Sequence, residues 1–210
     1  QIDSDVAGVA FSLNPLNNSY DEALITSNFG LGETVVSGTA TPDNFVIDKT
    51  TSKLKEKTLG TKEFSLKLVA DGTSEEKDEQ KQKEFSLSDK QVLKVYENLC
   101  EIEKDYQIPI DIEWALSDGE IYILQARPIT TYYYLPDELR TLNIEKKRLF
   151  WDVTLSVQGF DEPLSFLGAD LVGHVLGAVS EEVFGQNLLN DSKNKFAGFN
   201  DGRIYANIDN

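Results

Sequence analysis

The feature that most constrains the fold is a hairpin signal over residues 110–127. Two runs of alternating apolar and polar residues flank the dipeptide Asp118-Gly119, and such a dipeptide between alternating runs is a strong signal for a β-hairpin. Side chains alternate between the two faces of a strand, so each run places its apolar residues on one face and its polar residues on the other. The pattern predicts strands near 109–116 and 120–127.

The register of this hairpin depends on the length of its loop. A three-residue loop over residues 117–119 pairs Trp114 with Tyr122 on the apolar face. The same loop pairs Asp111 with Gln125 on the polar face. A two-residue loop would shift the pairing by one residue and point Gln125 away from Asp111. We therefore expect the three-residue loop, closed by a glycine in the left-handed conformation.

Four polar residues of the predicted hairpin then share one face: Asp111, Glu113, Gln125 and Arg127. Mg²⁺ prefers hard oxygen ligands and typically uses one or two carboxylates together with substrate phosphates. The guanidinium of arginine offers a planar fork to phosphate oxygens. Such a face suits a metal-bound polyphosphate. A surface hairpin with a cross-strand salt bridge accounts for the same pattern, because exposed charged faces are common.

Three sequence blocks carry a family resemblance. The motif D-I-E-W stands at 111–114 and L-Q-A-R-P-I-T at 124–130. Upstream, G-V-A-F-S-L-N-P occupies 8–15, and F-G-L-G-E at 29–33 is followed by V-V-S-G at 35–38 and T-P-D at 41–43. In this order, the blocks resemble the nucleotide-binding domain of the family of phosphoenolpyruvate synthase (pyruvate, water dikinase), pyruvate phosphate dikinase and rifampin phosphotransferase.

The resemblance implies an α+β fold, in which residues 1–130 form the second subdomain of an ATP-grasp nucleotide-binding domain. In that fold ATP lies between two α+β subdomains. The residues that the resemblance assigns to nucleotide binding are Gln1, Glu33, Asp111, Glu113, Gln125 and Arg127. Glu113 and Gln125 would hold Mg²⁺ or phosphate oxygens, Arg127 would clamp a phosphate as the catalytic residue, and Asp111 would support them. Glu33 would bond a ribose hydroxyl; the alternative is a solvated loop glutamate.

The implied function is that of an ATP-dependent phosphotransferase. The intact protein would bind Mg-ATP and phosphorylate a histidine on a separate domain of the same chain, for transfer to a small molecule such as pyruvate. The family's T-S-H-x-A-I motif is absent, and the only histidine, His174, lies in a helical run. This sequence therefore reads as a fragment that is inactive alone. The alternatives are a non-catalytic nucleotide-binding sensor or scaffold, and a phosphotransferase that acts on rifamycin-type antibiotics.

The chain changes character after residue 130. Residues 131–149 are expected to form a linker, and residues 150–210 the incomplete start of a mainly helical, substrate-binding-like second domain, with a helical pattern over 166–184. The chain begins at Gln1 and contains no Met, which also indicates a fragment.

Composition excludes some classes of function. The net charge of −16 repels phosphate backbones, so nucleic-acid binding is not expected. No apolar run approaches the length of a membrane span, and the N-terminus carries no signal peptide, so no membrane partner is expected. The single cysteine, Cys100, excludes an internal disulfide and fits a cytoplasmic protein. Its place in a helical pattern indicates a structural thiol rather than a nucleophile.

The remaining elements follow from periodicity. Strands are predicted over 6–13, 23–29, 43–48 and 62–69. Residues 71–84 contain no large apolar residue and are expected to form a mobile, solvated excursion. Ser88 and Gln91 then form a capping box, and a helix with an apolar stripe runs from there to about residue 106, ending before Pro109.

Overall fold

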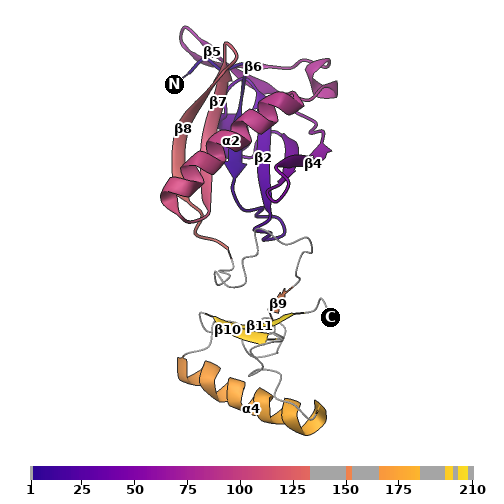
Figure 1. Ribbon diagram of the computed structural model, residues 1–210. Coiled ribbons are helices and arrows are strands. Elements are labelled where there is room, and N and C mark those ends of the chain that lie inside the picture. The colour runs from indigo at the N-terminus through magenta and orange to yellow at the C-terminus, as the bar shows by residue number, and fades with distance from the viewer. Residues whose placement is uncertain (1, 133–149, 153–165, 185–196, 201–202, 208–210) are drawn as a thin grey trace. The chain divides into compact units, whose positions relative to one another are not determined.

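The computed structural model describes residues 2–132, 150–152, 166–184, 197–200 and 203–207 (Figure 1). The chain divides into two compact units, Gln1–Tyr133 and Tyr134–Asn210, and each is described by itself. In the described part of the chain, no helix combines the length and the apolar character that crossing a membrane requires.

The first unit is built on a six-stranded sheet in which every neighbouring pair is antiparallel. Its strands are β1 (Val6–Phe11), β2 (Glu22–Phe29), β3 (Asp43–Asp48), β4 (Lys53–Thr58), β7 (Ile110–Ser117) and β8 (Glu120–Pro128). The order across the sheet is β4-β3-β2-β1-β7-β8, so that β4 and β8 form the two edges. The predicted strands in 6–13, 23–29 and 43–48 are confirmed, whereas β4 was not predicted.

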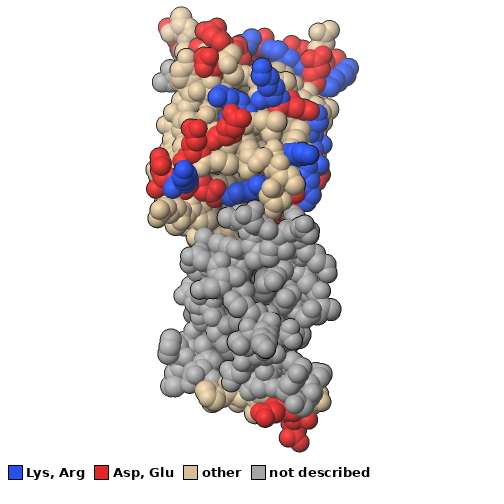
Figure 2. All heavy atoms as spheres, viewed as in Figure 1, with Lys and Arg blue, Asp and Glu red and all other residues tan. Residues whose placement is uncertain are grey.

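The helix α2 (Asp89–Tyr106) covers one face of this sheet (Figure 1). The predicted capping box is present: the Ser88 hydroxyl accepts a hydrogen bond from the backbone N–H of Gln91, and the Gln91 side chain accepts one from the backbone N–H of Ser88. The helix ends at Gln107, which adopts the left-handed conformation with φ of 58°. On the side of the molecule that α2 covers, Lys and Arg are interspersed with Asp and Glu (Figure 2).

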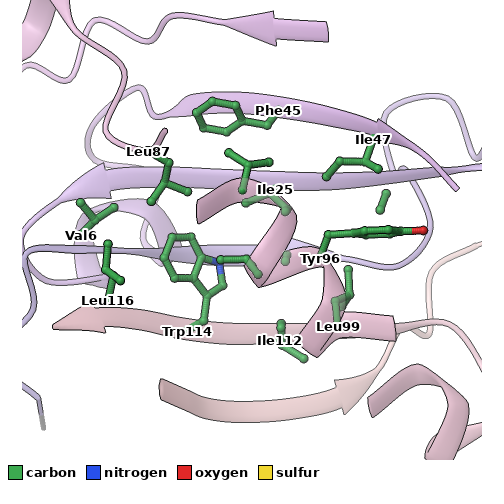
Figure 3. Close-up of a cluster of buried hydrophobic side chains, with 14 of the residues drawn as sticks. Val6, Ile25, Phe45, Ile47, Leu87, Tyr96, Leu99, Ile112, Trp114 and Leu116 are labelled. Carbon is green, nitrogen blue, oxygen red and sulfur yellow. The ribbon is translucent and has the colours of Figure 1, made fainter. Parts of the chain in front are cut away.

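The hydrophobic core lies between α2 and the sheet, with Trp114 in the middle of the cluster (Figure 3). Its largest fully buried members are Trp114, Phe45, Ile25, Ile47, Leu99, Ile110 and Ile112. Gly8 faces Trp114 across β1 and β7, and a Cβ at Gly8 would lie 1.8 Å from the carbonyl oxygen of Thr26. Only glycine fits there. Within the described residues the indole Nε1 has no hydrogen-bond partner.

A junction around Asp43 joins three segments that are distant in sequence. Oδ1 of Asp43 accepts from the backbone N–H of Gly60 at 2.8 Å and from Nζ of Lys62 at 2.6 Å. Oδ2 accepts from the backbone N–H and the hydroxyl of Ser86 at 2.7 and 2.8 Å. Asp43 and Lys62 are both buried. This arrangement, called the Asp43 junction below, ties the start of β3 to the loop at 60–62 and to the residues before α2.

A separate two-stranded sheet consists of β5 (Ser65–Val69) and β6 (Gly72–Glu76), and a short 3-10 helix, η1, spans Lys81–Lys83. The predicted strand over 62–69 is thus present in its second half. The solvated character expected for residues 71–84 is confirmed, because most of them are exposed, and their mobility stays a prediction. The sequence did not indicate that β6 and η1 lie within this range. Most side chains of β6 are exposed, so the backbone pairing with β5 gave no apolar signal in the sequence.

The described parts of the second unit are α4 (Phe166–Phe184) and a three-stranded antiparallel sheet. That sheet contains β9 (Phe150–Asp152), β10 (Ala197–Asn200) and β11 (Arg203–Asn207) in the order β10-β11-β9. The helical pattern over 166–184 is confirmed. The domain bounds expected at residues 130 and 150 stay a prediction.

Candidate functional site

The hairpin of β7 and β8 closes with two residues rather than three. Ser117 pairs with Glu120, and Asp118 and Gly119 between them have φ of 52° and 80°. Both values are positive, as a two-residue turn of type I′ requires. The expected three-residue loop is therefore wrong, although Gly119 adopts the left-handed conformation that was predicted.

A β-bulge restores the alternation that the shorter loop would break. Trp114 pairs with Ile123 and Glu113 pairs with Gln125, so Leu124 is an extra residue on β8. Beyond the bulge, Asp111 pairs with Arg127. Directly paired residues lie on the same face of a sheet, so the polar residues of both strands still share one face. The expected grouping is confirmed, with a different register.

Within this group of four polar residues, Asp111 and Arg127 form an ion pair. Nε of Arg127 donates to Oδ1 and Oδ2 of Asp111 at 3.0 and 2.8 Å. The Asp111 side chain is 8% exposed and that of Arg127 is 57% exposed, so a buried carboxylate holds an exposed cation. These hydrogen bonds and the charge of Asp111 raise the pKa of Arg127. The two terminal nitrogens of the guanidinium make no hydrogen bond within the described part of the chain.

Glu113 and Gln125 lie opposite each other in the next pair along the hairpin. Glu113 is half-buried and Gln125 is exposed. Among the described residues neither side chain is engaged in a hydrogen bond or an ion pair. Their oxygens are hard donors, which fits a Mg²⁺ ion that takes its other ligands from phosphate or water. The structure contains no cluster of three or more His, Cys, Asp or Glu in its described part, so such an ion would depend on those other ligands.

Tyr122 lies on the same face as this group, which the sequence pattern did not predict. It pairs with Ala115, which follows Glu113 on the same face of β7. Trp114 faces the core instead, opposite Ile123. The expected pairing of Trp114 with Tyr122 is therefore wrong. Alternation could not reveal this, because the shorter loop shifts every residue between the turn and the bulge to the other face.

A glycine-containing turn lies on the same side of the sheet. Gly30 has φ of 73°, and a Cβ there would lie 2.1 Å from the carbonyl oxygen of Leu66, so the turn needs glycine at this position. A Cβ at Gly32 would lie 3.4 Å from that of Ala7, and Ala7 pairs with Ala115. The short helix α1 (Glu33–Val36) follows directly.

The remaining candidate residues are less closely grouped. Glu33 is exposed in the first turn of α1, and among the described residues no hydrogen bond or ion pair joins its side chain to the four hairpin residues. Gln1 lies outside the described residues. Burial raises the pKa of the Cys100 thiol, as a structural cysteine requires. His174 is exposed on α4.

The first unit is an α+β unit with an antiparallel sheet. One face of this sheet presents carboxylate and amide oxygens together with a guanidinium, and such a face has the features of a nucleotide-binding domain. Residues 1–141 match the family described as pyruvate phosphate dikinase, AMP/ATP-binding domain. The match covers more than half of the 210 residues, and the chain belongs to this family.

Several curated proteins share this region. The chain is 44% identical over 131 residues to the uncharacterized phosphotransferase YvkC of Bacillus subtilis, covering 62% of this chain and 16% of that protein. It is 38% identical over 144 residues to the phosphoenolpyruvate synthase of Pyrococcus furiosus, covering 62% and 17%. It is 34% identical over 135 residues to the rifampicin phosphotransferase of Bacillus cereus, covering 63% and 15%. The chain thus spans less than a fifth of the length of these relatives.

Proposed function

We propose that residues 1–130 form one half of a Mg-ATP site, as the second subdomain of an ATP-grasp domain in a phosphotransferase of the phosphoenolpyruvate synthase family. The observation that carries the proposal is the bulged register of β7 and β8, which sets Glu113 against Gln125 and Asp111 against Arg127. Membership in the AMP/ATP-binding domain family supports the nucleotide. Similarity to the phosphoenolpyruvate synthase and to the rifampicin phosphotransferase supports the class of reaction.

Each residue of the group has a separate role in this proposal. Glu113 and Gln125 hold Mg²⁺ or bind phosphate oxygens directly. Arg127 binds a phosphate through its two terminal nitrogens, which its bond to Asp111 through Nε leaves available. Asp111 is a positioning residue, because its buried carboxylate fixes the direction in which the guanidinium points. Glu33 is proposed to bond a ribose hydroxyl, and Gln1 is kept as a candidate nucleotide-binding residue.

The chemistry that this group supports is phosphoryl transfer. Mg²⁺, when bound with ATP, neutralises charge on the phosphate oxygens. The protein groups hold the phosphates in place and stabilise the negative charge that is spread over the transferred group in the transition state. In the intact protein the first acceptor is a histidine on another domain, and the phosphoryl group then passes to a small molecule such as pyruvate.

The test uses the full-length protein in single-turnover phosphorylation by Mg-ATP. Glu113→Ala and Arg127→Ala are each expected to slow phosphorylation of the protein by about 10²–10³-fold, the usual cost of losing one electrostatic stabiliser. Neither change opens a core cavity, so both variants are expected to melt close to the wild type. Trp114→Ala is the control on the opposite face: it removes a fully buried indole and is expected to cost about 3–5 kcal/mol of stability.

Three outcomes would overturn the proposal or its reaction. If Glu113→Ala is phosphorylated at the wild-type rate, its carboxylate is not part of the site. If it melts as early as Trp114→Ala, the face is a structural one and the salt-bridged hairpin is the better account. A wild-type protein that binds Mg-ATP but is never phosphorylated would support a nucleotide sensor instead.

A further inference from the structure

Tyr122 adds an aromatic ring to the sheet face that carries the polar side chains of Glu113 and Gln125. Its side chain is 44% exposed, and on β7 its partner is the small Ala115. Within the described residues its hydroxyl makes no hydrogen bond. Tyrosine is common in strands, so its presence alone requires no function. Its position relative to the four polar residues is what distinguishes it.

The distance along β8 between the Tyr122 ring and the proposed phosphate-binding groups matches the distance between the base and the phosphates of an extended nucleotide. Tyr122 precedes Gln125 by three residues and Arg127 by five on one strand. At the rise of a β-strand, three residues correspond to about 10 Å, somewhat less across a bulge. An extended nucleoside triphosphate that lies along β8 with its phosphates at Gln125 and Arg127 therefore brings its base to Tyr122.

Phe11 is another aromatic residue on this face of the described sheet, but it is placed differently from Tyr122. Phe11 on β1 pairs with Asp111 on β7, which in turn pairs with Arg127 on β8. Phe11 therefore lies across the strands from the phosphate clamp and not along β8, the direction in which the extended nucleotide runs, and its side chain is only partly exposed. Tyr122 is also the more exposed of the two rings.

We infer that the ring of Tyr122 stacks on the base of the bound nucleotide, which makes it a specificity-determining residue for nucleotides over polyphosphates. The inference rests on the proposed Mg-ATP site. Stacking on an aromatic side chain depends on the flat face of a base and not on its edge. The contact therefore favours a nucleotide over a bare polyphosphate chain and discriminates little between purines.

The test compares two ligands on the full-length protein by isothermal titration calorimetry: Mg-ATP, and Mg-tripolyphosphate, which has no base. Tyr122→Ala is expected to bind Mg-ATP roughly 10- to 100-fold more weakly, the range typical of one lost base–aromatic stack, and to bind Mg-tripolyphosphate like the wild type. Tyr122→Phe keeps the ring and is expected to bind both like the wild type. Ile123→Ala is the matched control, because Ile123 is 37% exposed on the same strand but pairs with Trp114 on the opposite face of the sheet.

The outcomes separate this inference from the proposal on which it rests. Glu113→Ala is expected to weaken both ligands, and if it weakens neither, or the wild type binds neither, the Mg-ATP site itself is wrong. If Glu113→Ala weakens both while Tyr122→Ala binds Mg-ATP normally, only the stacking is refuted. Equal losses for the two ligands in Tyr122→Ala also refute it. So does a loss of Mg-ATP binding in Ile123→Ala as large as that in Tyr122→Ala, because the effect would then belong to the strand and not to the ring.

Discussion

Glu22 is a buried carboxylate that accepts hydrogen bonds from Asn14, Asn17 and Lys55. Nδ2 of Asn14 and of Asn17 each donate to its Oε2 at 2.9 Å, and Nζ of Lys55 donates to its Oε1. Burial alone would raise the pKa of this group. The hydrogen bonds from Lys55, Asn17 and Asn14 outweigh burial and lower the pKa from 4.5 to about 2.

This shift makes the stability of the first unit depend on pH. The pKa of Glu22 is lower in the folded chain than in the unfolded chain, so its contribution is complete above about pH 4.5 and is lost as the pH falls toward 2. We expect the free energy of unfolding to drop across this window by about 2–3 kcal/mol more in the wild type than in Glu22→Gln. Urea denaturation at a series of pH values measures this difference. Parallel pH profiles for the two proteins would show that the network contributes nothing.

The sequence could predict part of this region but not the network. The polar residues Asn17, Asn18 and Ser19 are typical of a turn between two strands, and Asn18 has φ of 56° in the structure. The pairing of Glu22 with Lys55 was not predictable, because Lys55 belongs to β4, a strand that the sequence did not indicate. A contact between two distant strands cannot be predicted from the apolar pattern of the sequence when one of the two strands has no such pattern.

At the scale of elements, the hairpin of β7 and β8 shows what the alternation of apolar and polar residues can and cannot predict about a strand pair. The polar residues 111, 113, 125 and 127 share a face as expected, but they do so through a two-residue turn and a bulge. The sequence does not distinguish a two-residue turn with a bulge from a three-residue loop without one. Both arrangements bury the apolar residues of β7 on the core face. Edge strands pose a similar problem: β4 and β6 bury little, so they lack apolar alternation.

The bulge leads to a prediction about deletions in β8. Removing Leu124 leaves Ile123 opposite Trp114 and Gln125 opposite Glu113, so the faces of all the other residues are kept. We expect this deletion to preserve cooperative thermal unfolding, followed by circular dichroism, and to preserve binding of Mg-ATP in the full-length protein.

The matched control is deletion of Ala126. This change would place Arg127 opposite Ile112, on the core face of the sheet. An unpaired charge on an apolar face is costly, so this deletion is expected to lower the melting temperature strongly and to abolish binding. If both deletions behave alike, Leu124 is not the extra residue that sets the register.

At the scale of the whole molecule, the first unit has a complete sheet and core of its own. All six strands of the large sheet and every buried residue of its hydrophobic cluster lie within residues 6–128. We expect residues 1–133, produced alone, to unfold cooperatively, with a midpoint in urea close to that of the same unit in the 210-residue chain. Fluorescence of Trp114, which is fully buried, reports the transition, and Trp151→Phe in the 210-residue chain removes the signal of its second tryptophan.

A chain cut at residue 119 is the matched control for this prediction. It lacks β8, and with it the partner strand of β7 and the residues Ile121 and Ala126, which pack against the core. We expect this shorter chain to lose cooperative unfolding. A gradual, non-cooperative transition in the 1–133 chain itself would contradict the independence of the first unit.

The Asp43 junction has a consequence for amide hydrogen exchange. The backbone N–H groups of Gly60 and Ser86 are 26 residues apart in sequence, yet both donate to the one carboxylate of Asp43. Neither amide belongs to a helix or a strand. A local unfolding event that releases the Asp43 carboxylate would expose both backbone N–H groups to solvent at once. In native-state hydrogen exchange the two amides should therefore have equal free energies of opening, as members of one cooperative unit. The exchange rates of these two loop amides would then measure the opening of the start of β3, as the amides within the strand do.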